Sequence, residues 1–331
     1  MSGRLTLLGA AVWVGLLASF AWRVRADEGF LHVVREGETL ASIAERYYGD
    51  PRREAILVAE NGLTAGGGAP IVVGLRLQIP SVSYHRVAPG ETWAELARRF
   101  YGDSRRAFVL MEANHGSSSE QPDEGAELLI PYPLRHVAAQ NENVLRIAKN
   151  YYGRGVEHAR RLRRFNNLRR NRLERGQLLL VPLSDLILSE EGRRIVEEET
   201  GVAPAAGEVR QLQARIEEDL PRLAEHLRRG RYAEAVALGN RLLGTDVLTG
   251  NQIVTIQREL GTAYVALGRE DLAVEAFRAA LARQPDLELD SVRTSPRVMR
   301  AFQRAKEAGE ESSATSDDSP PDDAGAADAG P

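Results

Sequence analysis

The same skeleton of residues occurs three times in the first half of the chain, opening at His32, His85 and His136, which are 53 and 51 residues apart. In each copy, a Gly that ends an aromatic-Tyr-Gly triplet follows the His by 17 residues, and an Asn follows this Gly by 12 or 13. A Pro closes each copy, after an interval of more variable length. Repetition of this kind predicts an array of small structural units.

Each copy has the pattern of a strand, two helices and a second strand. In the first copy, His32 to Val34 alternates as a short strand, and Gly37-Glu38-Thr39 predicts a turn in which Thr39 is the N-cap of a helix. A second helix is expected through Ile56 to Glu60, and residues 75–79 alternate as the closing strand. The apolar positions of the first helix recur at helical spacing, at Leu40, Ile43, Ala44 and Tyr47.

The other copies repeat these signals. Thr92 is followed three residues later by Glu95, which is the pattern of a capping box. Gly49 and Gly102 stand where C-terminal glycines end helices. We therefore expect α+β modules of the βααβ type, three in tandem. Their expected bounds are residues 32–80, 85–131 and 136–183.

These motifs resemble the LysM family. The first copy reads HVVREGETLASIAERYYGD, then ENGL and GLRLQIP, and the second reads HRVAPGETWAELARRFYGD, then EANHG and GAELLIP. The third copy, HVAAQNENVLRIAKNYYGRG with FNNL and RGQLLLVP, has Asn141-Glu142-Asn143 in place of Gly-Glu-Thr. The resemblance implies the LysM fold for all three copies and sugar-binding positions for the first two.

LysM modules bind polymers that contain N-acetylglucosamine, such as peptidoglycan or chitin, in a shallow groove between the first strand-helix turn and the loop before the last strand. By resemblance, this glycan-binding groove is lined in the first copy by Gly37, Glu38, Thr39, Leu40, Asn61, Gly62 and Leu63, and in the second by Gly90, Glu91, Thr92, Trp93, Asn114 and His115. Backbone amides at a turn can bind N-acetyl and hydroxyl groups, and a Leu or Trp can face a sugar ring. The alternative is structural: the threonines cap helices, the asparagines form turns and Trp93 belongs to the core.

The N-terminus predicts export. Arg4 is followed by residues Leu5 to Trp22, which carry no charge, and Val24-Arg25-Ala26 fits the pattern of a signal-peptide cleavage site. Residues 1–26 are therefore expected to be a signal peptide or, uncleaved, a membrane anchor, because the run is just long enough to span a bilayer. The chain has no cysteine, which excludes disulfides, thiolate metal sites and a cysteine nucleophile.

The third copy is strongly basic. Between Arg135 and Leu183 there are twelve Lys or Arg residues and three Glu, a net charge of +9, although the whole chain has a formal net charge of −4. Such a surface can attract peptide-stem carboxylates, anionic lipid headgroups or nucleic acid, but a solvated basic face is the simpler interpretation. Because few aromatic residues are interleaved and the N-terminus predicts export, no nucleic-acid partner is expected.

The second half of the chain predicts helices only. Residues 184–207 form a helical linker with a Gly/Ala/Pro break, and 208–306 form a helical domain. Residues 254–287 resemble a tetratricopeptide repeat (TPR), in which the small Gly261 and Ala273 let two helices approach while Tyr264 and Phe277 fill the space between them. The resemblance implies a protein partner, and a helical spacer is the alternative. The acidic segment 307–331 is expected to be disordered.

No pattern of a nucleophile elbow, a phosphate-binding loop or an HExxH zinc helix is present, so we expect no catalytic residue, metal or cofactor. The sequence predicts a non-enzymatic protein of the periplasm or cell envelope that binds peptidoglycan through its modules and a protein partner through its helices. One alternative is a membrane-anchored scaffold or assembly factor for an envelope complex, held in the inner membrane by Leu5 to Trp22. A second alternative is a cell-wall hydrolase with an unrecognised active site.

Overall fold

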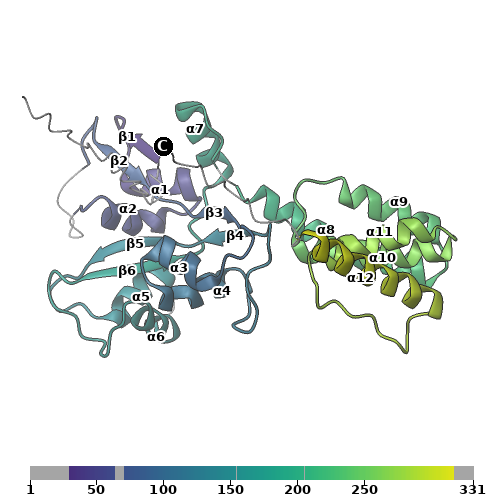
Figure 1. Cartoon of the computed structure of the whole chain (residues 1–331). Coiled ribbons are helices and arrows are strands. Elements are labelled where there is room, and N and C mark those ends of the chain that lie inside the picture. The colour runs from purple at the N-terminus through teal and green to yellow at the C-terminus, as the bar shows by residue number, and fades with distance from the viewer. Residues whose placement is uncertain (1–29, 64–70, 154, 205, 317–331) are drawn as a thin grey trace, which may run out of the picture.

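The computed structural model describes residues 30–63, 71–153, 155–204 and 206–316, which form three βααβ modules followed by an all-helical region. Figure 1 shows the modules gathered in one body, coloured purple to teal, and the helices of the C-terminal region in a second body, coloured green to yellow. The expected signal peptide or anchor, with its apolar run from Leu5 to Trp22, lies outside the described residues.

The predicted order of strand, helix, helix and strand is confirmed in each copy. Module 1 comprises β1 (Phe30–Val33), α1 (Leu40–Tyr48), the 3-10 helix η1 (Pro51–Arg53), α2 (Glu54–Glu60) and β2 (Arg76–Ile79). Module 2 comprises β3 (Ser83–Arg86), α3 (Trp93–Tyr101), η2 (Ser104–Arg106), α4 (Ala107–Ala113) and β4 (Glu127–Ile130). Module 3 comprises β5 (Tyr132–Val137), α5 (Val144–Tyr152), α6 (Val156–Phe165) and β6 (Leu178–Leu183).

In each module the first and last strands pair as a two-stranded antiparallel sheet, and the register repeats. The opening histidine always lies opposite a buried leucine, in the pairs His32↔Leu77, His85↔Leu128 and His136↔Leu179. In β1, His32 points into the module while Leu31 and Val33 are exposed, as the alternation of a half-buried strand requires. The predicted helix ends are also confirmed, because Gly49 and Gly102 are left-handed C-caps of α1 and α3.

The three modules share a continuous core. Phe165 of α6 is fully buried in the core of module 2, where its ring meets the rings of Tyr101 and Phe108 edge to face. Ile56 of module 1 and Leu129 of module 2 belong in turn to the core of module 3. The segments expected to separate the copies lie largely within β3 and β5. The modules are therefore packed against one another and are not joined by flexible linkers.

The segment after module 3 is more than a linker. Its helix α7 (Glu190–Thr200) packs against α1 of module 1. The backbone N–H of Ser189 donates to the carbonyl of Tyr47 at 2.8 Å. A Cβ on Gly192 would lie 2.6 Å from the same carbonyl oxygen, so only glycine allows this close approach. Residues 184–200 thus return the chain from module 3 to module 1.

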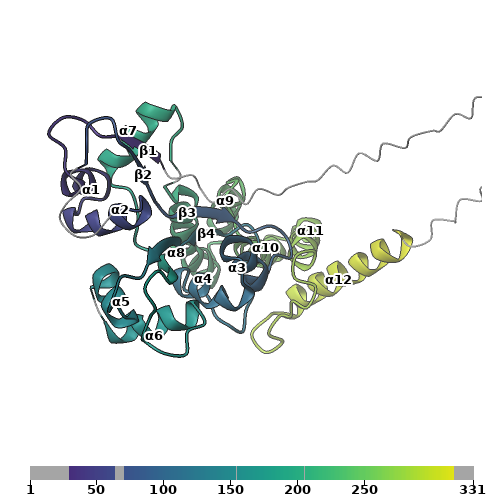
Figure 2. The same ribbon diagram turned by 90° about the vertical axis from the view of Figure 1, so that its left-hand side faces the viewer.

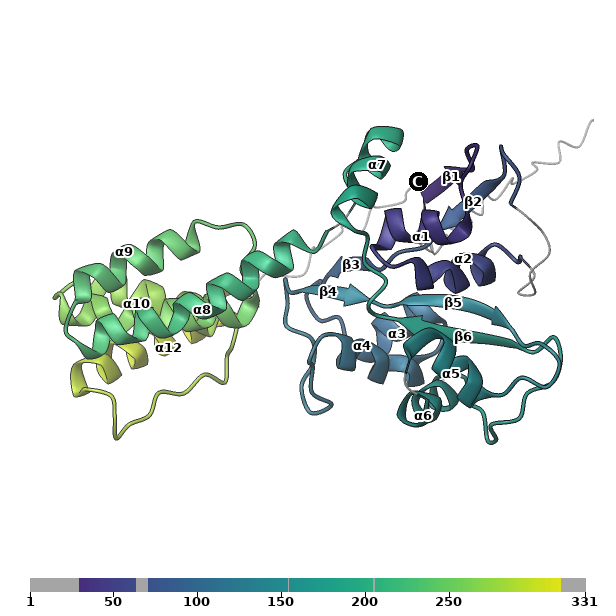
Figure 3. The ribbon, with the colours of Figure 1, turned by 180° about the vertical axis from the view of Figure 1, so that it is seen from behind.

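The C-terminal region consists of α8 (Glu208–Arg228), α9 (Tyr232–Leu243), α10 (Gly250–Ala266), α11 (Glu270–Leu281) and α12 (Pro296–Ser316). Helix α8 leads from the module body into the helical region (Figure 3), and α12 packs against α11 (Figure 2). Helix α12 continues to Ser316 and so includes the first ten residues of the segment for which disorder is expected, whereas residues 317–331 lie outside the described part. None of the described helices combines the length and apolar character needed to cross a membrane.

Small residues set the spacing of these helices. A Cβ on Gly261 of α10 would lie 2.6 Å from the ring of Phe277 in α11, and a Cβ on Gly239 of α9 would lie 2.7 Å from Leu260. Ala273 and Phe277 are fully buried. The predicted packing of α10 against α11 through Gly261 and Phe277 is therefore confirmed.

Candidate functional site

The turn between the first strand and the first helix has one conformation in all three modules. Gly37 and Gly90 adopt positive φ angles of 79° and 76°, and Asn141 adopts a φ of 63° at the corresponding position of module 3. Asparagine is one of the few residues other than glycine that tolerate this left-handed conformation. The third copy therefore keeps the turn, although its sequence lacks the Gly-Glu-Thr motif.

The glutamate of this turn points inward. One carboxylate oxygen of Glu38 accepts a hydrogen bond from the backbone N–H of Arg35 and lies 2.8 Å from Nε2 of His32. The arrangement recurs in module 2, where Glu91 bonds the Ala88 N–H and lies 2.6 Å from His85. In module 3, Glu142 likewise bonds the Ala139 N–H and lies 2.9 Å from His136. These glutamates thus fix the turn from inside the module.

Hydrogen bonding lowers the pKa of the two predicted site glutamates. Burial alone would raise the pKa of Glu38, but bonds from the Arg35 backbone, His32 and Arg46 outweigh it and hold the pKa at about 2. Burial is likewise outweighed at Glu91, whose pKa is lowered by bonds from the Ala88 backbone and His85. Both side chains are therefore charged at neutral pH and already engaged within the protein.

The threonines of the turn are helix caps. Thr39 accepts from the backbone N–H of Ser42, and Thr92 accepts from that of Glu95, each in a reciprocal capping box. The box predicted from Thr92 and Glu95 is confirmed. Thr39 is exposed and Thr92 half-buried, so both remain close enough to solvent to meet a ligand as well.

The asparagine that recurs in all three copies has a structural role. The amide of Asn61 donates to the carbonyls of Leu57 and Gln78, and its Oδ1 accepts from the backbone N–H of Gln78. Asn114 makes the same three bonds in module 2, to Leu110 and Leu129. These asparagines tie the end of the second helix to the last strand. Gly62, Leu63 and His115 directly follow them, and Gly62 and His115 are exposed.

Trp93 lies under a loop rather than on an open face. Only 7% of its surface is exposed, and its indole N–H donates to the carbonyl of Glu120 at 3.0 Å. Its backbone N–H donates to the side chain of Gln121, and a Cβ on Gly116 would come within 2.7 Å of its ring. Leu40, at the corresponding position of module 1, is half-buried against that module's core. Both apolar side chains therefore pack mainly against their own modules beside the predicted groove, and they face solvent less than the resemblance implies.

Hollows adjoin the turns of modules 2 and 3. In module 2, a hollow of about 570 Å³ is lined by the turn and by the outer face of α3, including Gly90 and Glu91. In module 3, a hollow of about 650 Å³ lies between the turn at residues 140–143 and the loop at 171–175. This second hollow occupies the place of the predicted groove, between the first turn and the loop before the last strand.

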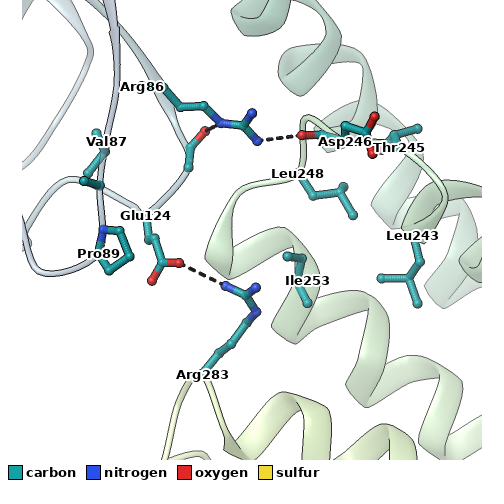
Figure 4. A pocket seen from close by; sticks show the side chains of 12 residues that line it. Arg86, Val87, Pro89, Glu124, Leu243, Thr245, Asp246, Leu248, Ile253 and Arg283 are labelled. Carbon is teal, nitrogen blue, oxygen red and sulfur yellow. Dashed lines mark hydrogen bonds and ion pairs between the residues drawn. The ribbon is translucent and has the colours of Figure 1, made fainter.

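The loop that covers Trp93 also forms the joint with the helical region. A cleft of about 540 Å³ lies at this joint. Figure 4 shows its lining, in which Arg86 bonds the carbonyl of Asp246 and Arg283 pairs with Glu124. The buried Gln213 of α8 donates to the carbonyl of Gly125 at 2.8 Å. Module 2 is thereby held to α8 and to the start of α10.

The sequence pattern missed the inward role of the glutamates and the strand-binding role of the asparagines. Both have a signal in the sequence: a Glu follows the opening His by six residues in every copy, and the Asn recurs even where the Gly-Glu-Thr turn does not. Because the Asn is present in the third copy without the Gly-Glu-Thr motif, its recurrence indicates a role in the fold more than a role in ligand binding.

With this geometry established, comparison with known proteins identifies the class of module. Residues 32–80, which correspond to module 1, match the sequence model of the LysM domain. Module 1 is therefore a LysM domain, and the presence of this domain implies peptidoglycan binding. Modules 2 and 3 repeat its βααβ fold and its turn.

Two curated relatives from Mycobacterium tuberculosis, Esterase Rv1288 of strain H37Rv and Esterase MT1326 of strain CDC 1551, are each 30% identical to this chain over 122 residues. The match covers 37% of this chain and 26% of each relative. The chain therefore spans about a quarter of the length of these relatives. No solved structure matches the chain.

Proposed function

We propose that this chain is a non-enzymatic cell-envelope protein that binds peptidoglycan through its three modules and a protein partner through its TPR-like helices. The observation that carries the proposal is the LysM match of module 1, whose turn recurs with the same backbone conformation in modules 2 and 3. Three modules on one shared core can contribute several weak contacts to one polymer, which raises the overall affinity when their spacing fits the polymer.

The proposed glycan contacts centre on the turn and on the residues after the second helix. The exposed backbone at Gly37, Gly90 and Gly62 can bind N-acetyl and hydroxyl groups, and Thr39 can contact a ligand while it caps α1. Glu38, Glu91, Asn61 and Asn114 act indirectly, by holding the turn and the last strand in place. Trp93 supports the loop at the groove wall.

For the helical region, we propose a TPR-like role in binding a partner. Its support is the close packing of α10 on α11 through Gly261 and Phe277, together with the flanking helices α8 and α12. The two mycobacterial esterases share with this chain a segment of only about a quarter of their length, so their names give no support to an esterase activity in the proposal. A membrane-anchored scaffold is the alternative that an uncleaved N-terminal segment would favour.

Co-sedimentation with purified peptidoglycan sacculi tests the proposal. Residues 27–331 are expected to pellet with sacculi at both low and high salt, because hydrogen bonds and ring contacts are screened little. Thr39→Ala combined with Thr92→Ala should reduce the bound fraction. Thr249→Ala, which removes an equivalent capping box in α10, is the matched control and should bind like the wild type.

Protein that stays in the supernatant at both salt concentrations would refute peptidoglycan binding. Release of soluble muropeptides during the same incubation would contradict the non-enzymatic part of the proposal. Retention at low salt only would assign the binding to the basic surface of module 3 instead of the turns.

A further inference from the structure

The hollow of module 3 is built from two chain segments that are tied together. Asn143 of the turn and Arg172 of the loop form an isolated antiparallel bridge, and the backbone N–H of Val144 donates to the carbonyl of Asn171 at 2.9 Å. These bonds close the floor of the hollow and fix the distance between its two walls. Leu145, 42% exposed, provides an apolar patch in the lining.

Two groups of arginines in this module have different surroundings. Two arginines of α6 are used in packing: Arg161 pairs with Glu112 of module 2, and Arg164 lies over the ring of Phe108 at 4.0 Å. The arginines of the second group lie in the loop before β6, at Arg169, Arg170, Arg172 and Arg175. They are exposed, and within the described part of the chain none of their side chains makes a hydrogen bond or an ion pair.

Arg172 and Arg175 line the hollow itself. Among the acidic residues of the lining, Glu142 is held by His136 and the Ala139 N–H, so that Glu174 alone is left to offset the four loop arginines. Several like charges gathered in one loop repel one another and attract anions. The guanidinium group can form two parallel hydrogen bonds to a carboxylate, which makes arginine well suited to recognise that group.

We propose that module 3 binds carboxylate-bearing glycan in this hollow in preference to neutral glycan, with Arg172 and Arg175 as the residues that determine the preference. This inference rests on the proposed function and adds a ligand class to it: N-acetylated strands that carry lactyl or peptide carboxylates, as in peptidoglycan. Leu145 contacts the sugar ring, while the arginines contact its acidic substituents. Nucleic acid fits the lining less well, because the hollow has no aromatic side chain on which a base could stack.

Isothermal titration of the full chain tests the preference with three ligands of similar length. These are a neutral N-acetylglucosamine oligomer, peptidoglycan strands stripped of their peptides by an amidase, and strands that retain the peptides. The double variant Arg172→Gln/Arg175→Gln removes two charges from the hollow. Arg297→Gln/Arg300→Gln removes two exposed charges from α12 and is the matched control.

At low salt, the hollow variant should bind peptide-bearing strands about 3- to 10-fold more weakly than the wild type, in keeping with two exposed charge pairs. Its affinity for the neutral oligomer should be unchanged, which also shows that the modules remain folded. The stripped strands, with lactyl carboxylates only, should show an intermediate loss. Near 1 M salt the difference should disappear, and the α12 variant should match the wild type throughout.

Equal binding of peptide-bearing strands by wild type and hollow variant would overturn this inference while leaving peptidoglycan binding intact. An equal loss for neutral and charged ligands would also overturn it, because the arginines would then support the shape of the hollow. Tighter binding of a single-stranded DNA oligomer that depends on the same two arginines would replace the proposed ligand. Failure of the wild type to bind any glycan would instead refute the proposed function.

Discussion

The carboxylate of Glu38 lies 2.8 Å from Nε2 of His32, six residues earlier in the chain, and also accepts a hydrogen bond from the backbone N–H of Arg35. The histidine ring is buried within β1, so one side-chain contact joins the first strand to the turn that follows it. The same pair recurs in all three modules. The conformation of each turn therefore depends on an interaction with the interior of its own module.

The low pKa of Glu38 predicts acid sensitivity of module 1. Because the pKa falls from its ordinary value of 4.5 to about 2 on folding, this carboxylate stabilises the folded state above pH 4.5, and the contribution is lost as the pH falls toward 2. Glu38→Gln should lower the thermal unfolding midpoint at pH 7, and the deficit relative to wild type should shrink between pH 4.5 and pH 2. Scanning calorimetry over this pH range measures the difference between the two unfolding midpoints. The exposed neighbour Glu36→Gln is the control, and a deficit that stays constant with pH would contradict the prediction.

Asn114→Ala should destabilise module 2 by about 2–3 kcal/mol, because the substitution removes three hydrogen bonds and leaves backbone groups of Leu110 and Leu129 without their partner. Trp93 is the only tryptophan beyond residue 22, so its fluorescence reports urea unfolding of this module in residues 27–331. Asn150→Ala, on the exposed face of α5, should change the stability by less than about 0.5 kcal/mol. Similar midpoints for the two variants would show that the asparagine is dispensable for the fold.

Phe100→Tyr should stabilise module 2 by about 0.5–1.5 kcal/mol. In modules 1 and 3 the hydroxyls of Tyr47 and Tyr151 bond Nδ1 of the opening histidine, at 3.1 and 2.8 Å. The Phe100 ring meets His85 in the same edge-to-face geometry but has no hydroxyl. The reverse change, Tyr151→Phe, should destabilise module 3 by a similar amount. Thermal unfolding of both variants is the measurement, and a loss of stability in Phe100→Tyr would mean that the added oxygen is buried without a partner.

Asp123→Ala should loosen the joint between module 2 and the helical region. Both carboxylate oxygens of Asp123 lie 3.2 Å from the backbone nitrogen of Asn251, in the first turn of α10. The loss of this carboxylate from the N-terminus of α10 is expected to cost about 1 kcal/mol. Amide hydrogen exchange should become faster in the first turn of α10, while Asp286→Ala, at an exposed position of the same region, should leave it unchanged. Unaltered exchange in the Asp123 variant would show that the other contacts hold the joint by themselves.

The sequence predicted the parts of the fold that depend on local signals. The βααβ order, the capping box of Thr92 and the C-cap glycines follow from short-range preferences, and the packing of Gly261 on Phe277 follows from residue size. The contacts between modules could not be predicted in this way. Nothing in the periodicity of α6 shows that Phe165 enters the core of module 2, because that depends on how two complete modules are oriented.

The candidate site was predicted less well than the fold. The turn and the end of the second helix lie at the residues where the sequence pattern put them, but a spacing pattern does not show which way a side chain points. Trp93 illustrates this limit, because its burial is decided by the loop at residues 115–121, which varies in length between copies. Asn141 illustrates a second limit. Its left-handed backbone makes it equivalent to the glycines of the other two turns, and a comparison of residue types does not reveal this equivalence.

The loop between His115 and Gly125 is bonded at one end to Trp93 in the groove wall and at the other to α8 and α10. A pulling force between a wall polymer held by module 2 and a partner held by the helices would therefore load this loop directly. The covalent connection between module 3 and α8 passes module 1, where the backbone of Ser189 bonds the carbonyl of Tyr47 before α7 begins. Tension between such a polymer and such a partner would therefore reach the helical region at the start of α10, where Asp123 bonds the backbone of Asn251.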